Sequence, residues 1–226
     1  EDAPPYVLFM IARQFRLLMR ASHLTAQRKP FAAVQEALGV PPFVARKIAA
    51  QVQHFPPQAF PGIFARLAEA DRELLAARQV KVVHCPESNQ KLAAGIAPVP
   101  ELLRRGIVVG LGTDGAASNN NLDMIEEMRT AALLQKALTG DPQALPAFVA
   151  LAMATVNGAK VLGLEGEVGL LKPGYRADIV LIGMHKPHLY PRHDPVAHLV
   201  YSAQGQDVDT VLVDGKILME KGRILT

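Results

Sequence analysis

The sequence contains one cysteine, Cys85, among 226 residues. A single cysteine excludes an internal disulfide framework and favours a reducing, cytoplasmic setting. No run of about 18 uncharged apolar residues occurs, so we expect no membrane-spanning helix. The apolar stretch at residues 6–12 meets Arg13 at once, and no small-residue cleavage site follows, which argues against a signal peptide. The chain starts with Glu1 rather than Met, so we expect a fragment or a processed chain.

Apolar residues make up half of the chain and charged residues a fifth. This balance supports a buried core and excludes intrinsic disorder. The charge is unevenly distributed: residues 1–79 have a net charge of +4, whereas residues 80–226 have −1. We expect this asymmetry to mark a junction between two unlike parts.

The first third of the chain has the spacing of amphipathic helices, with apolar residues three and four positions apart. The pattern predicts helices over 5–27, 31–38, 43–53 and 63–75. Strand signals are lacking up to Gln79, so we expect an all-α segment there.

The pattern changes at Val80. Two continuous apolar runs, 80–84 and 107–111, flank a helix predicted at 99–105. This order is typical of a parallel α/β unit that is buried on both faces. Beyond it we expect helices at 122–138, 146–155 and 157–162, then strands at 178–182, 209–213 and 216–226, with a hairpin turn at Asp214-Gly215.

Polar residues follow both predicted parallel strands, at 84–89 and at 112–120. Ligands bind outside the carboxyl ends of strands in such folds. A lone histidine at a strand end is more often structural than catalytic, and Thr113-Asp114-Gly115 alone is more often a turn. The two clusters together favour a site in which Asp114 approaches a metal or a water and His84 shuttles a proton or polarises the substrate.

Several segments resemble the amidohydrolase superfamily, and more narrowly its 5-methylthioadenosine/S-adenosylhomocysteine deaminases. The resemblance covers about residues 73–226 and is carried by the segments VVHCPESNQKL (82–92), VGLGTDGAASNNN (109–121), LDMIEEMRTAALL (122–134), ATVNGA (154–159), LKPGYRAD (171–178) and VDG (213–215). It implies a metal-dependent hydrolase of TIM-barrel type with a small β-domain. The implied reaction is hydrolytic deamination of the adenine ring of a purine nucleoside.

The resemblance also implies residue roles. Asp114 matches the metal-ligand aspartate of the last barrel strand, which also takes a proton from the attacking water. His84 matches the histidine beside that water and the purine. A divalent metal, with zinc as first choice if the full site is present, would lower the pKa of its bound water toward roughly 7. We expect four more residues to shape the substrate pocket: Ser88, Asn89, Ser118 and Asn119. Cys85 is expected to be a small apolar filler.

The chain departs from that family pattern in its metal ligands. No His-x-His pair occurs, and His23 and His54 stand in no matching motif. His185 and His188 are spaced as H-x-x-H, but we interpret them as part of a solvated loop. Because a catalytic metal usually needs three or more protein ligands, Asp114 alone predicts an incomplete and inactive site. Only the last two of eight barrel strands can be counted, which leaves open strand edges.

Residues 7–76 resemble a different family, the C-terminal helical domain of the DNA polymerase III delta subunit. The segments ARQFRLL (12–18), ALGVPPFVARK (37–47) and RLAEAD (66–71) carry this resemblance. It implies a clamp-loader collar module that binds other proteins and has no catalytic residues; a generic helical bundle with solvated basic faces is the alternative. No aromatic–basic interleaving suggests direct nucleic-acid binding.

The sequence therefore predicts an α/β fold preceded by an all-α domain. Its expected divisions are a helical bundle at 1–76, the last two strands of a barrel at 77–165 and a small β-domain at 166–226. The two resemblances meet near residues 71–78, which suggests a fusion of two fragments. Three functions remain open: a deaminase part, a collar module with an attached passenger, and a remnant that pairs through its open edge with another chain.

Overall fold

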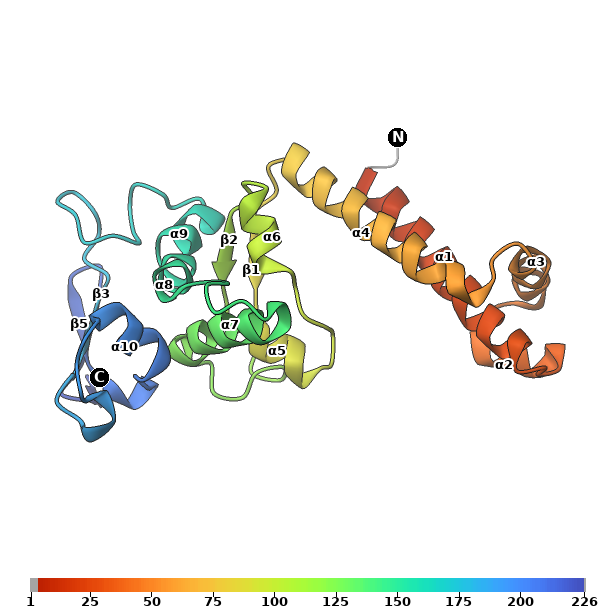
Figure 1. The fold of residues 1–226 in the computed structure, drawn as a ribbon. Coiled ribbons are helices and arrows are strands. Elements are labelled where there is room, and N and C mark those ends of the chain that lie inside the picture. Colours follow the sequence, from red (N-terminus) through yellow and green to blue (C-terminus); the bar gives the residue numbers. More distant parts are fainter. Residues whose placement is uncertain (1–3, 226) are drawn as a thin grey trace. The chain divides into compact units, whose positions relative to one another are not determined.

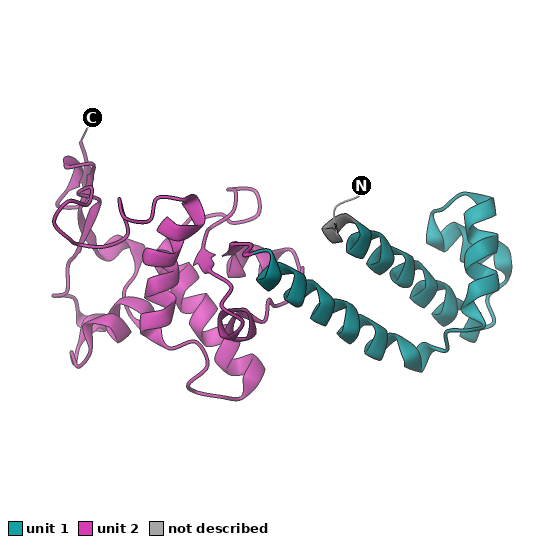
Figure 2. Cartoon of the chain, turned by 90° about the horizontal axis from the view of Figure 1, so that it is seen from above, with its two compact units in different colours: residues 1–78 teal, residues 79–226 magenta. Residues whose placement is uncertain are grey.

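The computed structural model describes residues 4–225, and side chains from residue 7 onward. The chain divides into two compact units, residues 1–78 and 79–226 (Figure 2). In the first unit every described element is helical: α1 (Pro4–Ala26), α2 (Phe31–Leu38), α3 (Pro42–Val52), a 3-10 turn η1 (Pro57–Ala59) and α4 (Phe60–Ala77). The predicted helices are present, with ends shifted by a few residues.

The first unit is held by an apolar core in which α1 packs against α2, α3 and α4. Its buried residues include Leu18, Leu38, Ile48 and Phe60. Gly39 ends α2 in the left-handed conformation, at a φ of 61°, which a residue with a side chain rarely adopts. Prolines at the starts of α3 and α4 fit first-turn positions, where no intrahelical N–H bond is lost.

The second unit begins with a parallel pair of strands (Figure 1). Its elements are β1 (Val82–His84), α5 (Pro86–Lys91), α6 (Val99–Arg104), β2 (Val109–Leu111), α7 (Met124–Thr139), α8 (Ala147–Ala154), α9 (Val156–Leu162), β3 (Ile179–Ile182), η2 (Pro187–Leu189), α10 (Pro195–Tyr201), η3 (Gly205–Asp207), β4 (Val208–Val213), β5 (Lys216–Glu220) and β6 (Arg223–Ile224). Helices α5 and α10 were not predicted from the sequence.

The strands β1 and β2 lie in parallel register, with His84 opposite Leu111. Strand β2 is completely buried because α7, α8 and α9 pack on it. Helix α9 comes closest: the Asn157 side-chain amide donates to the Val109 carbonyl at 3.0 Å. A Cβ on Gly110 would lie 3.3 Å from the Gly158 backbone, so glycine is needed at this contact. The predicted parallel α/β unit is therefore present, although both strands are shorter than expected.

A separate antiparallel sheet closes the chain, in the order β3-β4-β5-β6. The hairpin turn at Asp214-Gly215 has the positive φ values, 50° and 77°, of a type I′ turn, as the sequence predicted. The prediction of a single strand over 216–226 is wrong. Lys221 and Gly222 both have positive φ, so the chain turns there and forms two short strands, β5 and β6.

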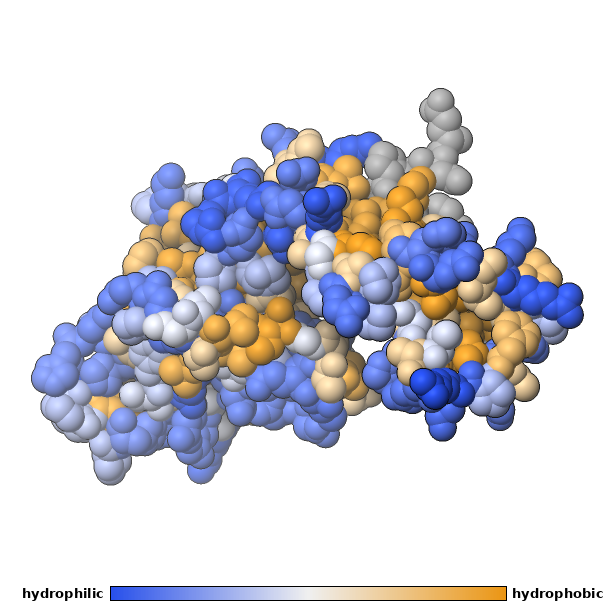
Figure 3. All heavy atoms as spheres, turned by 45° about the vertical axis from the view of Figure 1, so that its right-hand side comes forward, coloured by the Kyte–Doolittle hydropathy of each residue, from blue (hydrophilic) through white to orange (hydrophobic). Residues whose placement is uncertain are grey.

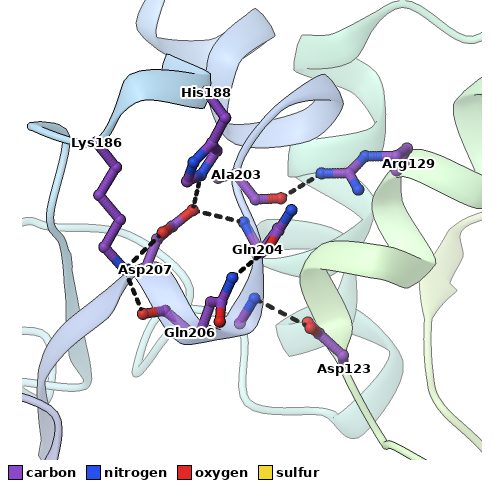
Figure 4. A network of polar contacts seen from close by, with 9 residues as sticks. Asp123, Arg129, Lys186, His188, Ala203, Gln204, Gln206 and Asp207 are labelled. Atoms are coloured by element: carbon purple, nitrogen blue, oxygen red, sulfur yellow. Dashed lines mark hydrogen bonds and ion pairs between the residues drawn. The ribbon is translucent and has the colours of Figure 1, made fainter.

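A buried carboxylate organises the loops beside this sheet (Figure 4). Asp207 is 2% exposed and pairs with Lys186 and His188, each at 2.8 Å. Its side chain also accepts a hydrogen bond from the Gln204 backbone at 2.9 Å. His188 is exposed, as the interpretation of a solvated loop expects, and its ring also binds this buried acid.

Apolar side chains interrupt the polar surface in several places (Figure 3). On α1 the exposed ones include Val7, Phe9, Met10 and Ile11. No helix within residues 4–225 is long and apolar enough to cross a membrane.

Candidate active site

The candidate site forms where the two parallel strands end. His84 is the last residue of β1, and Asp114 lies three residues beyond the end of β2. The Gly112 amide donates to the His84 carbonyl at 3.0 Å, so the two chain segments leave the sheet side by side. The two polar clusters therefore lie at the same edge of the parallel strand pair, where we expected them.

Two serines hold the carboxylate of Asp114. The Ser88 hydroxyl, from α5, donates to Asp114 Oδ2 at 2.7 Å, and the Ser118 hydroxyl donates to the same oxygen at 2.5 Å. The hydrogen bonds from Ser118, then Ser88, and one from the Gly115 backbone lower the pKa of Asp114 below its usual 3.8. The carboxylate is thus ionised and oriented at neutral pH, while Asp114 itself is exposed.

The backbone of Asp114 is in the left-handed region, at a φ of 60°. Aspartate adopts this conformation more readily than most residues, but it still costs free energy. The turn at Thr113–Gly115 therefore aims the carboxylate at the expense of local stability.

His84 differs from Asp114 in being buried, with 3% of its surface exposed. Neither ring nitrogen has a hydrogen-bond partner among the described residues. Burial lowers the pKa of His84 from 6.5 to about 4, so the ring is neutral at physiological pH. A buried imidazole without partners is costly, which makes this ring the strongest candidate for contact with a bound molecule.

The four residues expected to shape a pocket do not act together. Ser88 and Ser118 bind Asp114, whereas the Asn119 side chain turns away and donates to Glu127 Oε1 at 2.6 Å. For Asn89, the hydrogen bonds involve the backbone: its N–H donates to the Cys85 carbonyl at 3.0 Å, and its carbonyl accepts from the Ala94 N–H at 2.9 Å. A hollow of about 220 Å³ beside the site is lined by Glu87, Lys91 and residues 118–121.

The sequence reading overlooked a pair of acids beneath the site, Glu87 and Glu127. Glu127 is completely buried on α7, and burial raises its pKa from 4.5 to about 7. Glu87 accepts a hydrogen bond from Thr130 Oγ1 at 3.1 Å. The signal that could have found Glu127 is its place on the apolar face of the helix, between Met124 and Met128.

A metal site is not complete in these residues. Within residues 4–225 no group of three or more His, Cys, Asp or Glu side chains is arranged to hold a metal ion. Asp114 offers one carboxylate ligand, and its neighbours Ser88 and Ser118 are hydroxyl donors to it. Because catalytic zinc usually has three protein ligands, the described residues do not by themselves fit a catalytic metal.

A larger cavity lies in another part of the second unit. It has a volume of about 750 Å³, and its lining is mostly apolar, from α7, α8 and the sheet of β3 and β4. None of the six predicted site residues lines it. This apolar cavity therefore does not include the predicted site residues, although Asn121 lines both it and the hollow beside the site.

The amidohydrolase family model, described as "Amidohydrolase family", matches residues 40–218. The chain therefore belongs to the amidohydrolase family, and by family it is a hydrolase, as the sequence predicted. The match starts within the first unit and runs across the junction expected near residues 71–78. These findings give no support to the resemblance of residues 7–76 to a clamp-loader subunit.

Two curated relatives and one solved structure show the narrower similarity. The chain is 64% identical over 159 residues to a 5-methylthioadenosine/S-adenosylhomocysteine deaminase of Pelotomaculum thermopropionicum. It is 58% identical over 159 residues to a 5'-deoxyadenosine deaminase of Methanosarcina acetivorans. Both alignments cover 70% of this chain and 36% of the relative, so the chain spans about a third of the length of these proteins.

Among solved structures, the chain resembles an adenosine deaminase from Xanthomonas campestris crystallised with bound zinc. The TM-score is 0.67 at 33% identity, over 86% of this chain and 48% of the other. This similarity supports an amidohydrolase-type α/β fold for the chain.

Proposed function

We propose that this chain is part of a deaminase that hydrolyses adenosine analogues, with 5-methylthioadenosine and S-adenosylhomocysteine as the substrate class. In this reaction the oxygen of a water forms a bond to the ring carbon that carries the amino group, the exocyclic C–N bond breaks, and the amino group leaves as ammonia. One observation carries the proposal: the Ser88 and Ser118 hydroxyls hold the Asp114 carboxylate at the end of one strand, while the neighbouring strand ends in His84. The names of the relatives support the substrate class.

Asp114 and His84 have complementary roles in this proposal. Asp114 is ionised, so it accepts the proton of the attacking water. His84 is neutral, so one ring nitrogen donates a hydrogen bond while the other accepts one. Such a ring contacts the purine and orients it without adding a positive charge to the site.

The hydroxyls of Ser88 and Ser118 keep the Asp114 carboxylate in one rotamer. Asn119 stabilises the loop rather than the substrate, because its amide faces Glu127. For Asn89 we retain a contribution to the pocket floor as a proposal. The division into a barrel part at 77–165 and a β-domain at 166–226 is likewise part of the proposal.

We further propose that the isolated chain does not turn over substrate. The described residues supply one candidate metal ligand, and the zinc of the related structure is bound by that protein. A divalent metal, zinc by analogy, would then need ligands from outside these residues. The C-terminal unit provides the proton acceptor and the purine contact, and further polypeptide completes the site.

Ammonia release from 5-methylthioadenosine tests this proposal. The full chain with zinc is compared with a chimera in which residues 79–226 replace the equivalent segment of the Pelotomaculum relative. We expect no ammonia from the chain alone and turnover by the chimera. Asp114→Asn in the chimera should abolish turnover, whereas Asp209→Asn, an exposed strand residue, should preserve it. A folded chimera that binds zinc but releases no ammonia would contradict the assignment.

A further inference from the structure

Helix α7 places a second carboxylate, that of Glu127, between the two segments that hold Asp114. These segments are the start of α5, with Ser88, and the loop after β2, with Ser118. Its side chain is 0% exposed. The Asn119 amide donates to Glu127 Oε1 at 2.6 Å, and the Glu87 backbone N–H donates to Glu127 Oε2 at 3.3 Å. Oε1 of Glu127 thus binds the loop after β2, and Oε2 binds the start of α5.

The donors to Glu127 are the sequence neighbours of the donors to Asp114. Glu87 immediately precedes Ser88, and Asn119 immediately follows Ser118. Both serine hydroxyls converge on Asp114 Oδ2. The exposed carboxylate of Asp114 and the buried one of Glu127 therefore bridge the same pair of segments, one residue apart.

The side chain of Glu87 reinforces this bridge. Its Oε1 accepts from Thr130 Oγ1 at 3.1 Å, and its Oε2 accepts from the Asn119 amide at 3.4 Å. Thr130 lies on α7, as Glu127 does, so the start of α5 is fixed to α7 at two points. The side-chain oxygen Oδ1 of Asn119 completes the set by accepting from the Leu122 backbone N–H at 3.1 Å.

We propose that Glu127 is a positioning residue for Asp114: it fixes the spacing of the two segments and so delivers Ser88 and Ser118 to the Asp114 carboxylate. This inference rests on the proposed function of Asp114 and adds a residue for which the sequence motifs gave no role. Glu127 does not touch the substrate in this account. It acts through the two segments.

A carboxylate is the side chain that this position requires. Glu127 has two acceptor oxygens for two donors, whereas glutamine at the same place has one oxygen and would turn its NH₂ group toward the second donor. Burying an acid costs free energy unless hydrogen bonds compensate for it, so a packing role alone would favour an apolar residue. The hydrogen bonds from Asn119 and from the Glu87 backbone compensate for the burial of this acid.

Nuclear magnetic resonance of the full chain tests the proposal through the carboxyl ¹³C signal of Asp114. The measurement is made at one pH, about 8, above the usual pKa values of carboxylic acids. Ser88→Ala gives the reference shift for a loosened Asp114. Glu127→Gln is the main variant, and Asn119→Ala interrupts the same link from its other end. Gln135→Leu is the matched control: Gln135 is equally buried on α7 but donates to the Ala97 carbonyl.

We expect Glu127→Gln and Asn119→Ala to move the Asp114 signal in the same direction as Ser88→Ala, and Gln135→Leu to leave it in place. An unmoved Asp114 signal in both variants would overturn the proposal. An equal movement in Gln135→Leu would also overturn it, because it would show general loosening of α7. The readout is independent of turnover, so an inactive chimera counts against the proposed function and an unmoved signal counts against the positioning role.

Discussion

Gly205 lies against the carboxylate of Asp123, a residue 82 positions earlier in the chain. The Gly205 amide donates to Asp123 Oδ2 at 3.1 Å, and a Cβ on Gly205 would lie only 2.6 Å from that oxygen. Through its other oxygen, Asp123 caps α7 by accepting from the Ile125 backbone at 2.8 Å. One side chain therefore starts the helix and fixes the turn before β4 (Figure 4).

Gly205→Ala should destabilise the second unit, because the added methyl group displaces the Asp123 carboxylate from its cap. We expect a loss of roughly 1–3 kcal/mol, as for overpacking at a tight contact. Gly158→Ala is the control, since its Cβ would meet only the Met153 carbonyl oxygen at an ordinary 3.6 Å. Urea unfolding measures both. A loss in Gly158→Ala as large as in Gly205→Ala would contradict the clash.

Asp207→Asn should also destabilise this unit. Burial by itself would raise the pKa of Asp207, but the hydrogen bonds from Lys186 and His188 outweigh burial and lower it to about 2. We expect a loss of about 1–3 kcal/mol from the weakened charge-assisted bonds. Asp209→Asn, on an exposed strand position, should change stability by less than about 0.5 kcal/mol.

The charge of Asp207 also predicts a pH effect. Its folded pKa is depressed, so its stabilising contribution is present above 3.8 and is lost as the pH falls toward 2. Acid unfolding curves of the wild type and Asp207→Asn should therefore converge in that range. Curves that stay a constant distance apart would show that the ion pairs do not carry the stability.

His84 and Glu127 should produce opposite pH slopes. Because the pKa of Glu127 is raised, its contribution to the free energy of unfolding is complete below pH 4.5. This contribution is lost as the pH rises through 7. Because the pKa of His84 is lowered, its contribution to the free energy of unfolding is complete above pH 6.5. This contribution is lost as the pH falls through 4. Between about pH 4.5 and 6.5 the two effects oppose each other and nearly cancel.

Single variants separate these slopes. Glu127→Gln should become less stable on acidification over this window, and His84→Gln should become less stable as the pH rises, each by roughly 2–3 kcal/mol. Tyrosine fluorescence during urea unfolding is the measurement, because the chain has no tryptophan and three of its four tyrosines, at 175, 190 and 201, lie in the second unit. A flat profile in both variants would contradict both assignments.

Ser118→Ala should raise the pKa of Asp114 more than Ser88→Ala does, because the hydrogen bond from Ser118 is the larger cause of its depression. Titration of the Asp114 carboxyl signal by nuclear magnetic resonance measures the change. Ser22→Ala, whose hydroxyl donates to the Phe55 carbonyl in the first unit, should leave that pKa unchanged. The reverse order of the two serines would show that Ser88 is the main donor.

The sequence predicted the strands well where local chemistry decides them. The β-branched runs ending at His84 and Leu111 form the parallel pair, and Asp214-Gly215 forms the hairpin, because only residues that tolerate positive φ fit that turn. Helix α5 was missed because Pro86 looks like a loop residue, although proline suits the first turn of a helix. The break at Lys221-Gly222 was missed although residues 220–223 interrupt the apolar pattern and contain a glycine.

The positions of His84 and Asp114 at the strand ends could be predicted from the sequence, whereas their roles stay predictions. Strand-end logic located His84 and Asp114, since any parallel pair brings its carboxyl ends together. The role of Asn119 in shaping the pocket stays a prediction: Asn119 lines the hollow beside the site, and its side chain also binds Glu127, on a helix eight residues later. Periodicity identifies a buried face but does not show which buried acid finds two donors. That information is present only in the packed structure.

The left-handed backbone conformation of Asp114 costs stability, while its carboxylate serves the proposed reaction. Glycine adopts a φ of 60° without steric cost, so Asp114→Gly would relieve roughly 1 kcal/mol or more of strain while deleting the carboxylate. The same substitution would remove the hydrogen bonds that Ser88 and Ser118 donate to the carboxylate, which opposes this gain in stability. Screens for variants of higher thermal stability therefore need a binding or turnover readout at every round.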